Sequence, residues 1–343
     1  MTVMNRSTRA SIVVGCLIAS VLLWAHPSPA ASFADLPKDW PEVSLLKDRL
    51  WIRAPKAARL EPTPFGIMEA PPPAERQMLV VIDSGPLRLV AFVSEMFCVS
   101  PVDFTQLGTA YVKGLEQNPR LDRLSAAPNA TNVNGLEVLE YEPRSTARIA
   151  DANLVKGALI RHPDGSVQSI AFFVNDSGLA DLPAARQLVT NMIASLKPGP
   201  RQLVTGARVQ LAGASLDLDL PPDYTAYQQR GPDFDVYWIE HLVTLNQPAG
   251  RLGIYSGHHP QRPAHPAAAR AQRAVLFGVD VQWRVWEEPS TQGGAVVFHQ
   301  EAFVPVPAGG LIRHVFFTAV TPAERAAFER IAETAAFPPS SRP

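Results

Sequence analysis

One strand–helix pattern occurs twice in this chain, once at the end of each half. In the first half, the apolar run 169–174 passes through a polar turn into a helix that starts near Pro183. Its apolar side chains recur at the i, i+3, i+4 spacing of one buried helix face: Ala185, Leu188, Val189, Met192, Ile193 and Leu196. The pattern therefore predicts that the first half closes with a helix packed on a sheet.

The second copy closes the chain in the same way. The run 311–317 is its strand, and Thr-Pro-Ala-Glu at 321–324 has the form of a capping box with proline at the first helical position. The helix that follows is expected to bury Ala327, Phe328, Ile331 and Ala335. We therefore predict an α+β fold class: two tandem α/β sandwich domains, each an antiparallel sheet packed by helices.

Length and charge limit the classes of protein to which the chain can belong. With 343 residues, two ordinary domains can each bury a core of their own. The formal net charge of −1 gives no general attraction to nucleic acid or to anionic membranes. Lys-Pro-Gly-Pro at 197–200 is a short linker stiffened by proline. The expected domains are therefore residues 40–198 and 207–338.

The first 31 residues have the plan of a secretory signal peptide. A basic start is followed by the apolar run 12–24 and then by small residues that suit a cleavage site. Because the run is short for a membrane span, we expect cleavage after Ala30 or Ala31, no membrane insertion of the mature chain, and a periplasmic location. Lipidation at Cys16 and retention as an uncleaved anchor are the alternatives.

Cleavage would leave Cys98 as the single cysteine. One thiol cannot form an intramolecular disulfide, so the stability of the mature chain has to come from packing. The apolar neighbours of Cys98 predict a buried, inert thiol.

Within each half, the pattern gives an order of elements. In the first, a strand ended by proline is followed by a hairpin of 78–82 with 87–93, a helix, further antiparallel strands and the closing helix. The apolar residues of the middle helix lie on one face: Phe104, Leu107, Gly108, Tyr111, Val112 and Leu115. In the second, alternation at 216–222 predicts a half-buried strand ended by proline. Residues 266–275 stand where the first half has its middle helix, but their periodicity is poor, so the two copies differ most there.

This order of elements resembles that of the Mog1/PsbP/DcrB-like family. In the first half the resemblance rests on Ala54-Pro55, the helix around Tyr111, Asn-Gly-Leu-Glu-Val at 134–138 and Met-Ile-Ala-Ser-Leu at 192–196. In the second half it rests on Leu-Pro-Pro-Asp-Tyr at 220–224 and on the final strand–helix pair. It implies an α/β sandwich in each domain. Members of the family look like binding modules and chaperone-like adaptors, so the resemblance also implies a binding role without enzymatic activity, although a shared fold does not establish function.

A histidine-rich loop is the one candidate for a metal site. Its members are His258, His259 and His265, and three imidazoles in a proline-rich loop could bind zinc or copper. Their spacing matches no known ligand frame, so an exposed polar loop between strands is the simpler interpretation. We predict no cofactor.

The sequence lacks the marks of a hydrolase. A G-x-S-x-G turn is absent, and His241, His299 and His314 all fall within expected strands, where a lone histidine is more often a satisfied sheet residue than a general base. A serine hydrolase is the third hypothesis and would need a convergent Ser/His/Asp pocket.

Aromatic residues are concentrated in the second half. The candidates for a binding surface are Tyr237, Trp238, Tyr255, Trp283 and Trp286. Tryptophan and tyrosine dominate binding hot spots, whereas core packing is the ordinary use of aromatics. Because strand residues alternate in direction, Trp283 and Trp286 should point to opposite faces of the sheet.

These observations favour a non-enzymatic periplasmic protein that binds another protein. The partner would be an envelope protein, as for an adaptor or chaperone, or a toxin from a neighbouring cell, as for an immunity protein. The alternative is a module that binds a small ligand or a metal through the histidine loop.

Overall fold

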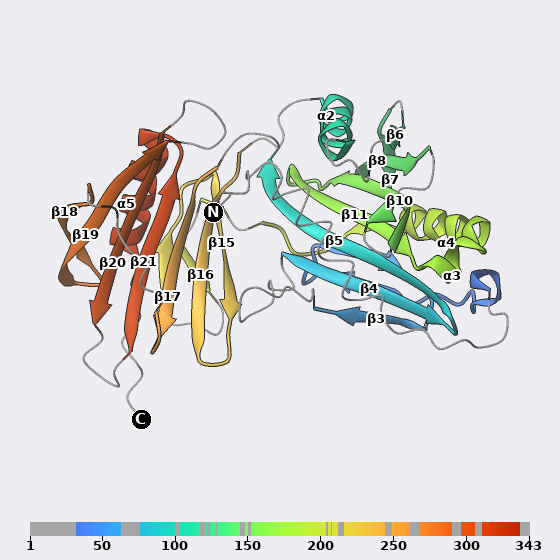
Figure 1. Ribbon diagram of the computed structural model, residues 1–343, viewed down its shortest axis with the longest axis horizontal. Helices are drawn as coiled ribbons and strands as arrows, with labels where there is room; N and C mark the ends of the chain where they lie inside the picture. The colour runs from blue at the N-terminus through green and yellow to red at the C-terminus, as the bar shows by residue number, and fades with distance from the viewer. Residues whose placement is uncertain are drawn as a thin grey trace. The chain divides into compact units, whose positions relative to one another are not determined.

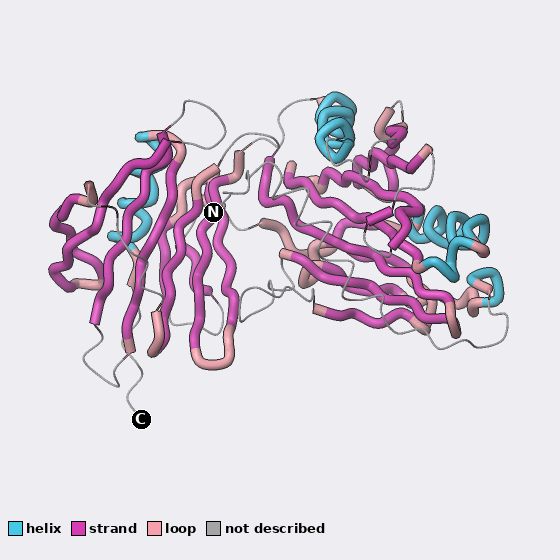
Figure 2. The backbone as a smooth tube through the Cα atoms, viewed as in Figure 1, coloured by secondary structure: helices cyan, strands magenta, loops and turns pink. Residues whose placement is uncertain are grey.

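The computed structural model describes residues 32–336 except 63–75, 100–102, 117–120, 122–123, 128, 145–147, 150–151, 204, 207, 212–215, 244–248, 261–265, 267, 290–295 and 306–310. The signal peptide expected at residues 1–31 therefore lies outside the described residues. The chain divides into two compact units, residues 1–202 with 244–246 and residues 203–243 with 247–343, called unit one and unit two below. Strands predominate in both units (Figure 2).

Unit one is built on a large antiparallel sheet. In chain order its strands are β3 (Ala58–Glu61), β4 (Gln77–Ser84), β5 (Leu87–Val99), β6 (Leu124–Ala126), β7 (Thr131–Val133), β8 (Leu136–Pro143), β9 (Arg148–Ile149), β10 (Ala152–Arg161) and β11 (Ser166–Val174). They lie in the order β3-β4-β5-β11-β10-β8-β6, with β7 beside β8 and β9 beside β10 (Figure 1). The hairpins β4–β5 and β10–β11 turn at Gly85 and Gly165, which have φ angles of 59° and 85°. Glycine adopts such angles without steric cost.

Helices cover both faces of this sheet. Helix α4 (Leu182–Ala194) follows the short helix α3 (Asp176–Leu179) and packs on one face, and its predicted apolar positions from Ala185 to Ile193 are buried in the same core as Ile170 and Phe172 of β11. Helix α2 (Phe104–Glu116) buries Phe104, Leu107, Gly108 and Val112 against the other face. The predicted middle and closing helices of the first half are confirmed.

A small second sheet lies over the core of unit one. It pairs β1 (Glu42–Leu45) with β2 (Leu50–Arg53) and β2 with β12 (Lys197–Pro198), the segment that leaves α4. Leu46, Lys47 and Asp48 form the tight β1–β2 turn with φ angles of 51°, 51° and 65°. The residue after this turn, Arg49, is only 2% exposed.

Arg49 is the centre of a buried polar network. Its Nε donates to Glu95 Oε2 at 3.2 Å, and its Nη1 donates to Asp164 Oδ2 at 2.6 Å and to the carbonyl oxygen of Arg201 at 3.0 Å. Gln168 Nε2 donates to the same Glu95 oxygen at 3.0 Å. Burial raises the pKa of Glu95 above its ordinary value, and Arg49 partly offsets this effect. The guanidinium thus joins the small sheet, the large sheet and the segment beyond β12.

Unit two repeats the strand order of unit one. Its elements are β13 (Arg208–Leu211), β14 (Leu216–Asp219), β15 (Tyr224–Arg230), β16 (Phe234–His241), β17 (Arg251–Gly257), β18 (Arg270–Leu276), β19 (Val279–Pro289), β20 (Val296–Pro305), β21 (Ile312–Ala319) and α5 (Pro322–Thr334). The sheet runs β15-β16-β17-β21-β20-β19-β18, so in both units three consecutive strands are followed by four later strands in reverse chain order. In both units the segment after the closing helix also pairs with an earlier strand: β12 pairs with β2, and Ala336 forms a bridge with Asp217 of β14.

The units differ where the sequence indicated. Between β17 and β18 the described residues form no helix, and the segment expected at the place of α2 instead contributes the edge strand β18. On the other face α5 buries Ala327, Phe328 and Ile331, as predicted, and Ala335 just beyond the helix is buried as well. None of the helices in the described part of the chain is long and apolar enough to cross a membrane.

Candidate functional site

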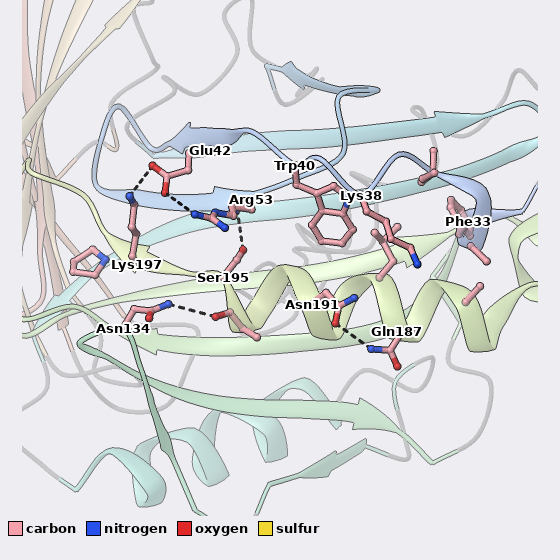
Figure 3. A pocket seen from close by; sticks show the side chains of 16 residues that line it. Phe33, Lys38, Trp40, Glu42, Arg53, Asn134, Gln187, Asn191, Ser195 and Lys197 are labelled. Carbon is pink, nitrogen blue, oxygen red and sulfur yellow. Dashed lines mark hydrogen bonds and ion pairs between the residues drawn. The ribbon is translucent and has the colours of Figure 1, made fainter.

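A groove of about 1050 Å³ runs along helix α4 of unit one (Figure 3). Three parts of the chain line it: the N-terminal segment 33–42, the outward face of α4, and the end of the small sheet with Arg53, Lys197 and Pro198. Asn134, from the turn between β7 and β8, completes the lining near the end of the helix. The groove is the candidate functional site because it gathers aromatic, cationic and amide side chains in one concave surface.

The N-terminal wall is anchored at the start of α4. Ser32 Oγ and the backbone N–H of Phe33 both donate to Asp181 Oδ2, at 2.8 and 2.6 Å, and the Phe33 ring is buried in the core. Residues Phe33–Asp35 form one 3-10 turn, η1. Further along, the Trp40 indole N–H donates to the carbonyl oxygen of Pro37 at 2.7 Å, so the ring is fixed by its own segment.

The α4 wall presents small and amide side chains. Gln187 Nε2 donates to Asn191 Oδ1 at 3.0 Å, as expected for residues one helical turn apart. Asn134 donates through Nδ2 to the carbonyl oxygens of Leu196 and Ala194, at 2.8 and 3.3 Å. Asn134 has a φ angle of 51°, a conformation that asparagine tolerates better than most residues. This amide caps the end of the helix, which would otherwise leave carbonyl groups open.

Charged side chains meet at the end of the small sheet. Glu42 accepts from Lys197 Nζ at 2.6 Å and lies 3.8 Å from Arg53 Nη2. The hydrogen bond from Lys197, with the nearby charge of Arg53, lowers the pKa of Glu42 below its ordinary value. Lys38, on the N-terminal wall, is exposed and makes no ion pair with any residue that the structure describes.

This arrangement suits binding of a polypeptide. Small-molecule sites are mostly enclosed and apolar, whereas this groove is open and its side chains offer hydrogen-bond donors and acceptors along its length. Tryptophan and arginine, present here as Trp40 and Arg53, are the residue types that most often carry the energy of protein interfaces. No sequence pattern predicted this site, and its one local sign is a tryptophan, Trp40, within a polar N-terminal segment.

Three of the five predicted binding aromatics are buried, so an exposed cluster of all five is not formed. Tyr237 and Trp283 belong to the core beneath α5, where Trp283 is 1% exposed and meets the Phe317 ring at a centroid distance of 5.8 Å. Trp238 lies on the opposite face, where the Arg251 guanidinium stands 3.3 Å from its ring. These aromatics pack the unit.

The other two predicted aromatics are half-buried. Tyr255 stacks on Phe234 with ring centroids 5.5 Å apart, and its hydroxyl accepts from the backbone N–H of His259 at 3.1 Å. Trp286 stacks on His299 at 5.1 Å. Trp283 and Trp286 thus differ in exposure as the strand alternation predicts. A role of the five aromatics in partner binding stays a prediction, and Tyr255 and Trp286 are their more exposed members.

The histidine loop is only partly described. His258 and His259 follow β17, and their ring centroids lie 6.4 Å apart, whereas His265 falls outside the described residues. Within the described ranges, no three histidine, cysteine or acidic side chains gather in a way that could hold a metal ion. Metal binding by the three histidines also stays a prediction.

The histidines of the strands face carboxylates. His314 Nε2 lies 3.0 Å from Glu301 Oε2, and His299 Nε2 lies 3.5 Å from Glu288 Oε2. His241 is held between two acids: its Nδ1 lies 3.0 Å from Glu324 Oε1 and its Nε2 lies 2.9 Å from Asp223 Oδ2. Both acids raise the pKa of His241 above its ordinary value, with the hydrogen bond to Glu324 the largest cause.

We expect unit two to lose stability as the pH rises through the raised pKa of His241. A histidine whose pKa is higher folded than unfolded contributes stability below its unfolded pKa, and that contribution disappears when the folded imidazole loses its proton. The melting temperature should therefore fall as the pH rises above about 6.5, and His241→Phe, which keeps a ring against Tyr224, should flatten this slope. An equal slope in both proteins would contradict the assignment to His241.

Comparison with known proteins gives only loose structural likenesses. No protein-family model matches the chain, and no curated protein sequence matches it. The apo structure of the immunity protein TplEi of the T6SS from Pseudomonas aeruginosa aligns at 12% identity and a TM-score of 0.24, over 88% of this chain and 98% of that one. The Tle4–Tli4 complex contains a chain that aligns at 11% identity and a TM-score of 0.25, over 88% and 98%. Superpositions this loose carry no argument about fold or function.

Proposed function

We propose that this chain is a periplasmic protein-binding protein without enzymatic activity, made of two tandem copies of one domain. The strand order that the two units share supports the duplication. The secretory pattern of the first 31 residues supports the periplasmic location. Within this class the candidates are an immunity protein that neutralises a toxin delivered by a neighbouring cell and an envelope adaptor or chaperone.

The open groove along α4 is the observation that carries the proposal. Its lining combines an oriented indole ring, three cationic side chains and several side-chain amides, which together match the mixture of apolar contact and hydrogen bonding in protein interfaces. Nothing in this set of residues acts as a nucleophile paired with a base. Binding is therefore the function that the geometry supports best.

Truncation of Trp40 should weaken the complex with the partner about thirtyfold, since loss of an interface hot spot costs about 2 kcal/mol. The partner would be captured by cross-linking to the full chain in its own periplasm, purified, and titrated by calorimetry against the wild type and Trp40→Ala. Lys113→Ala, on the exposed side of α2, is the matched control and should bind as the wild type does.

Two further results decide between the candidates. Inhibition of the purified partner's toxicity by the chain would identify an immunity protein, whereas improved folding or assembly of an envelope partner would identify an adaptor. Equal binding by Trp40→Ala and the wild type, with unchanged melting temperatures, would remove the groove from the interface. Failure of every purified candidate to bind the full chain would overturn the protein-binding function itself.

A further inference from the structure

We propose that the groove along α4 receives an acidic, extended segment of the protein partner. The inference rests on the proposed function and adds the chemistry of the segment that is recognised. It follows from the charges of the lining, the length of the groove and the hydrogen-bonding groups along it.

The charge of the lining is locally positive. The lining contains three cationic side chains, Lys38, Arg53 and Lys197, and one carboxylate, Glu42. Glu42 is already compensated by Lys197 and Arg53, so the groove keeps an excess of two positive charges. Because the whole chain has a formal net charge of −1, this excess belongs to the groove and is no general property of the protein. Charge complementarity of this kind steers association and selects the partner.

Lys38 is the cation most available to a ligand. It is exposed and without an ion pair among the described residues, and the adjacent Asp39 is held by Lys56, which is not part of the lining. Arg53 and Lys197 share Glu42 and lie at one end of the groove, whereas Lys38 lies further along it, beyond Trp40 and before Phe33 (Figure 3). A bound segment would therefore meet positive charge at two separate places along the groove.

The groove has the length of a short peptide. The α4 residues that line it extend from Ala184 to Ala194, which spans roughly 15 Å at the helical rise of about 1.5 Å per residue. An extended chain advances about 3.3 Å per residue, so about five residues would fill this length. A segment of this size, with two acidic residues set apart along it, matches the positions of the cations.

The remaining lining supports an extended backbone. The amides of Gln187 and Asn191 each contain both donors and acceptors, which suits the alternating groups of a peptide. Asn134 donates to the carbonyl oxygens of Ala194 and Leu196 at the end of α4. Because these oxygens already accept a hydrogen bond, they do not need a cation from the ligand. Between Arg53 and Lys38, the Trp40 ring provides an oriented apolar surface.

The test is selection from a random twelve-residue peptide library displayed on phage, with the full chain as the target. We expect peptides enriched in Asp and Glu, whose affinity, measured by fluorescence anisotropy, falls as salt is added. Lys38→Glu should weaken these peptides about tenfold or more, since it places like charges together. Lys113→Glu, an equal charge change on α2 outside the groove, should leave the affinity unchanged.

The outcomes separate this inference from the proposed function. Peptides without an acidic bias, no enrichment over blank beads, or equal binding by Lys38→Glu and Lys113→Glu would overturn the acidic segment. If the purified partner binds the wild type and Lys38→Glu equally, the inference fails while the protein-binding function stands. If acidic peptides bind but no intact protein does, the protein-binding function fails and the preference of the groove stands. Melting curves of both variants verify that each is folded.

Discussion

Replacement of Arg49 by methionine is expected to destabilise unit one by about 3–5 kcal/mol, because removal of one partner leaves a buried charge without compensation. Arg49 is 2% exposed, and its guanidinium hydrogen-bonds the carboxylates of Glu95 and Asp164. For a domain of this size the loss corresponds to a fall in melting temperature of roughly 10 °C. Hydrogen exchange should localise the loss of protection to β5 and β11.

The control for this prediction is Arg53→Met in the same small sheet. Arg53 is exposed and its ion pair with Glu42 is long, at 3.8 Å, so its loss should cost less than about 1 kcal/mol. A second change, Glu95→Leu in the Arg49→Met background, removes the stranded carboxylate and should restore part of the stability. Unchanged melting of Arg49→Met would show that the network contributes nothing to stability.

The loss should also depend on pH. Without Arg49, burial raises the pKa of Glu95 still further above its unfolded value, and a carboxyl group of this kind favours the folded state only while it is protonated. The deficit of Arg49→Met relative to the wild type should therefore increase as the pH rises from acid to neutral. Melting curves between about pH 4 and pH 7 check this sign.

Trp283→Ala is expected to destabilise unit two by about 3–5 kcal/mol, the usual cost of truncating a large buried aromatic. Trp283 is 1% exposed within the core that α5 covers, and a close-packed core relaxes only partly around the space left by an indole ring. Trp286→Ala, three residues further along the same strand but half-buried, should cost less than about 1.5 kcal/mol.

The contrast between these two variants matters for any binding experiment. A loss of binding in a protein that lacks Trp283 would report unfolding of unit two, whereas Trp286 can be tested with the fold intact. Chemical denaturation of both variants, followed by exchange in β19 and β20, measures the difference. Equal stability of the two variants would show that Trp283 is not a core residue.

The closing elements could be predicted because their signals are local. In α5, Thr321 Oγ1 accepts from the backbone N–H of Glu324 at 3.1 Å, as the capping pattern predicts. The carboxylate of Glu324 accepts from the amides of Val320 and Gly250, and the latter contact joins residues 74 positions apart. Local periodicity gives the helix and its first turn, but it holds no information about such distant partners.

The groove and the edge strand could not be predicted for the same kind of reason. Ser32 and Asp181, which fix the N-terminal wall, are 149 positions apart, and no pattern within either segment indicates the other. Strand β18 is exposed along most of its length, so it lacks the apolar alternation by which a half-buried strand is found. Alternation gave the opposite faces of Trp283 and Trp286 correctly, but it could not show that the face bearing Trp238 is shielded by Arg251.

The path of the chain beyond β12 decides where the first copy can be cut. The backbone N–H groups of Gly199 and Arg201 donate to the carbonyl oxygens of Arg49 and Asp48, at 3.0 and 3.1 Å, and the carbonyl oxygen of Arg201 accepts from the Arg49 side chain. A fragment that stops at residue 198 would lose all three hydrogen bonds and expose the guanidinium it depends on. Dissection, circular permutation or exchange of the two copies should therefore retain the chain through Arg201 as part of the first module.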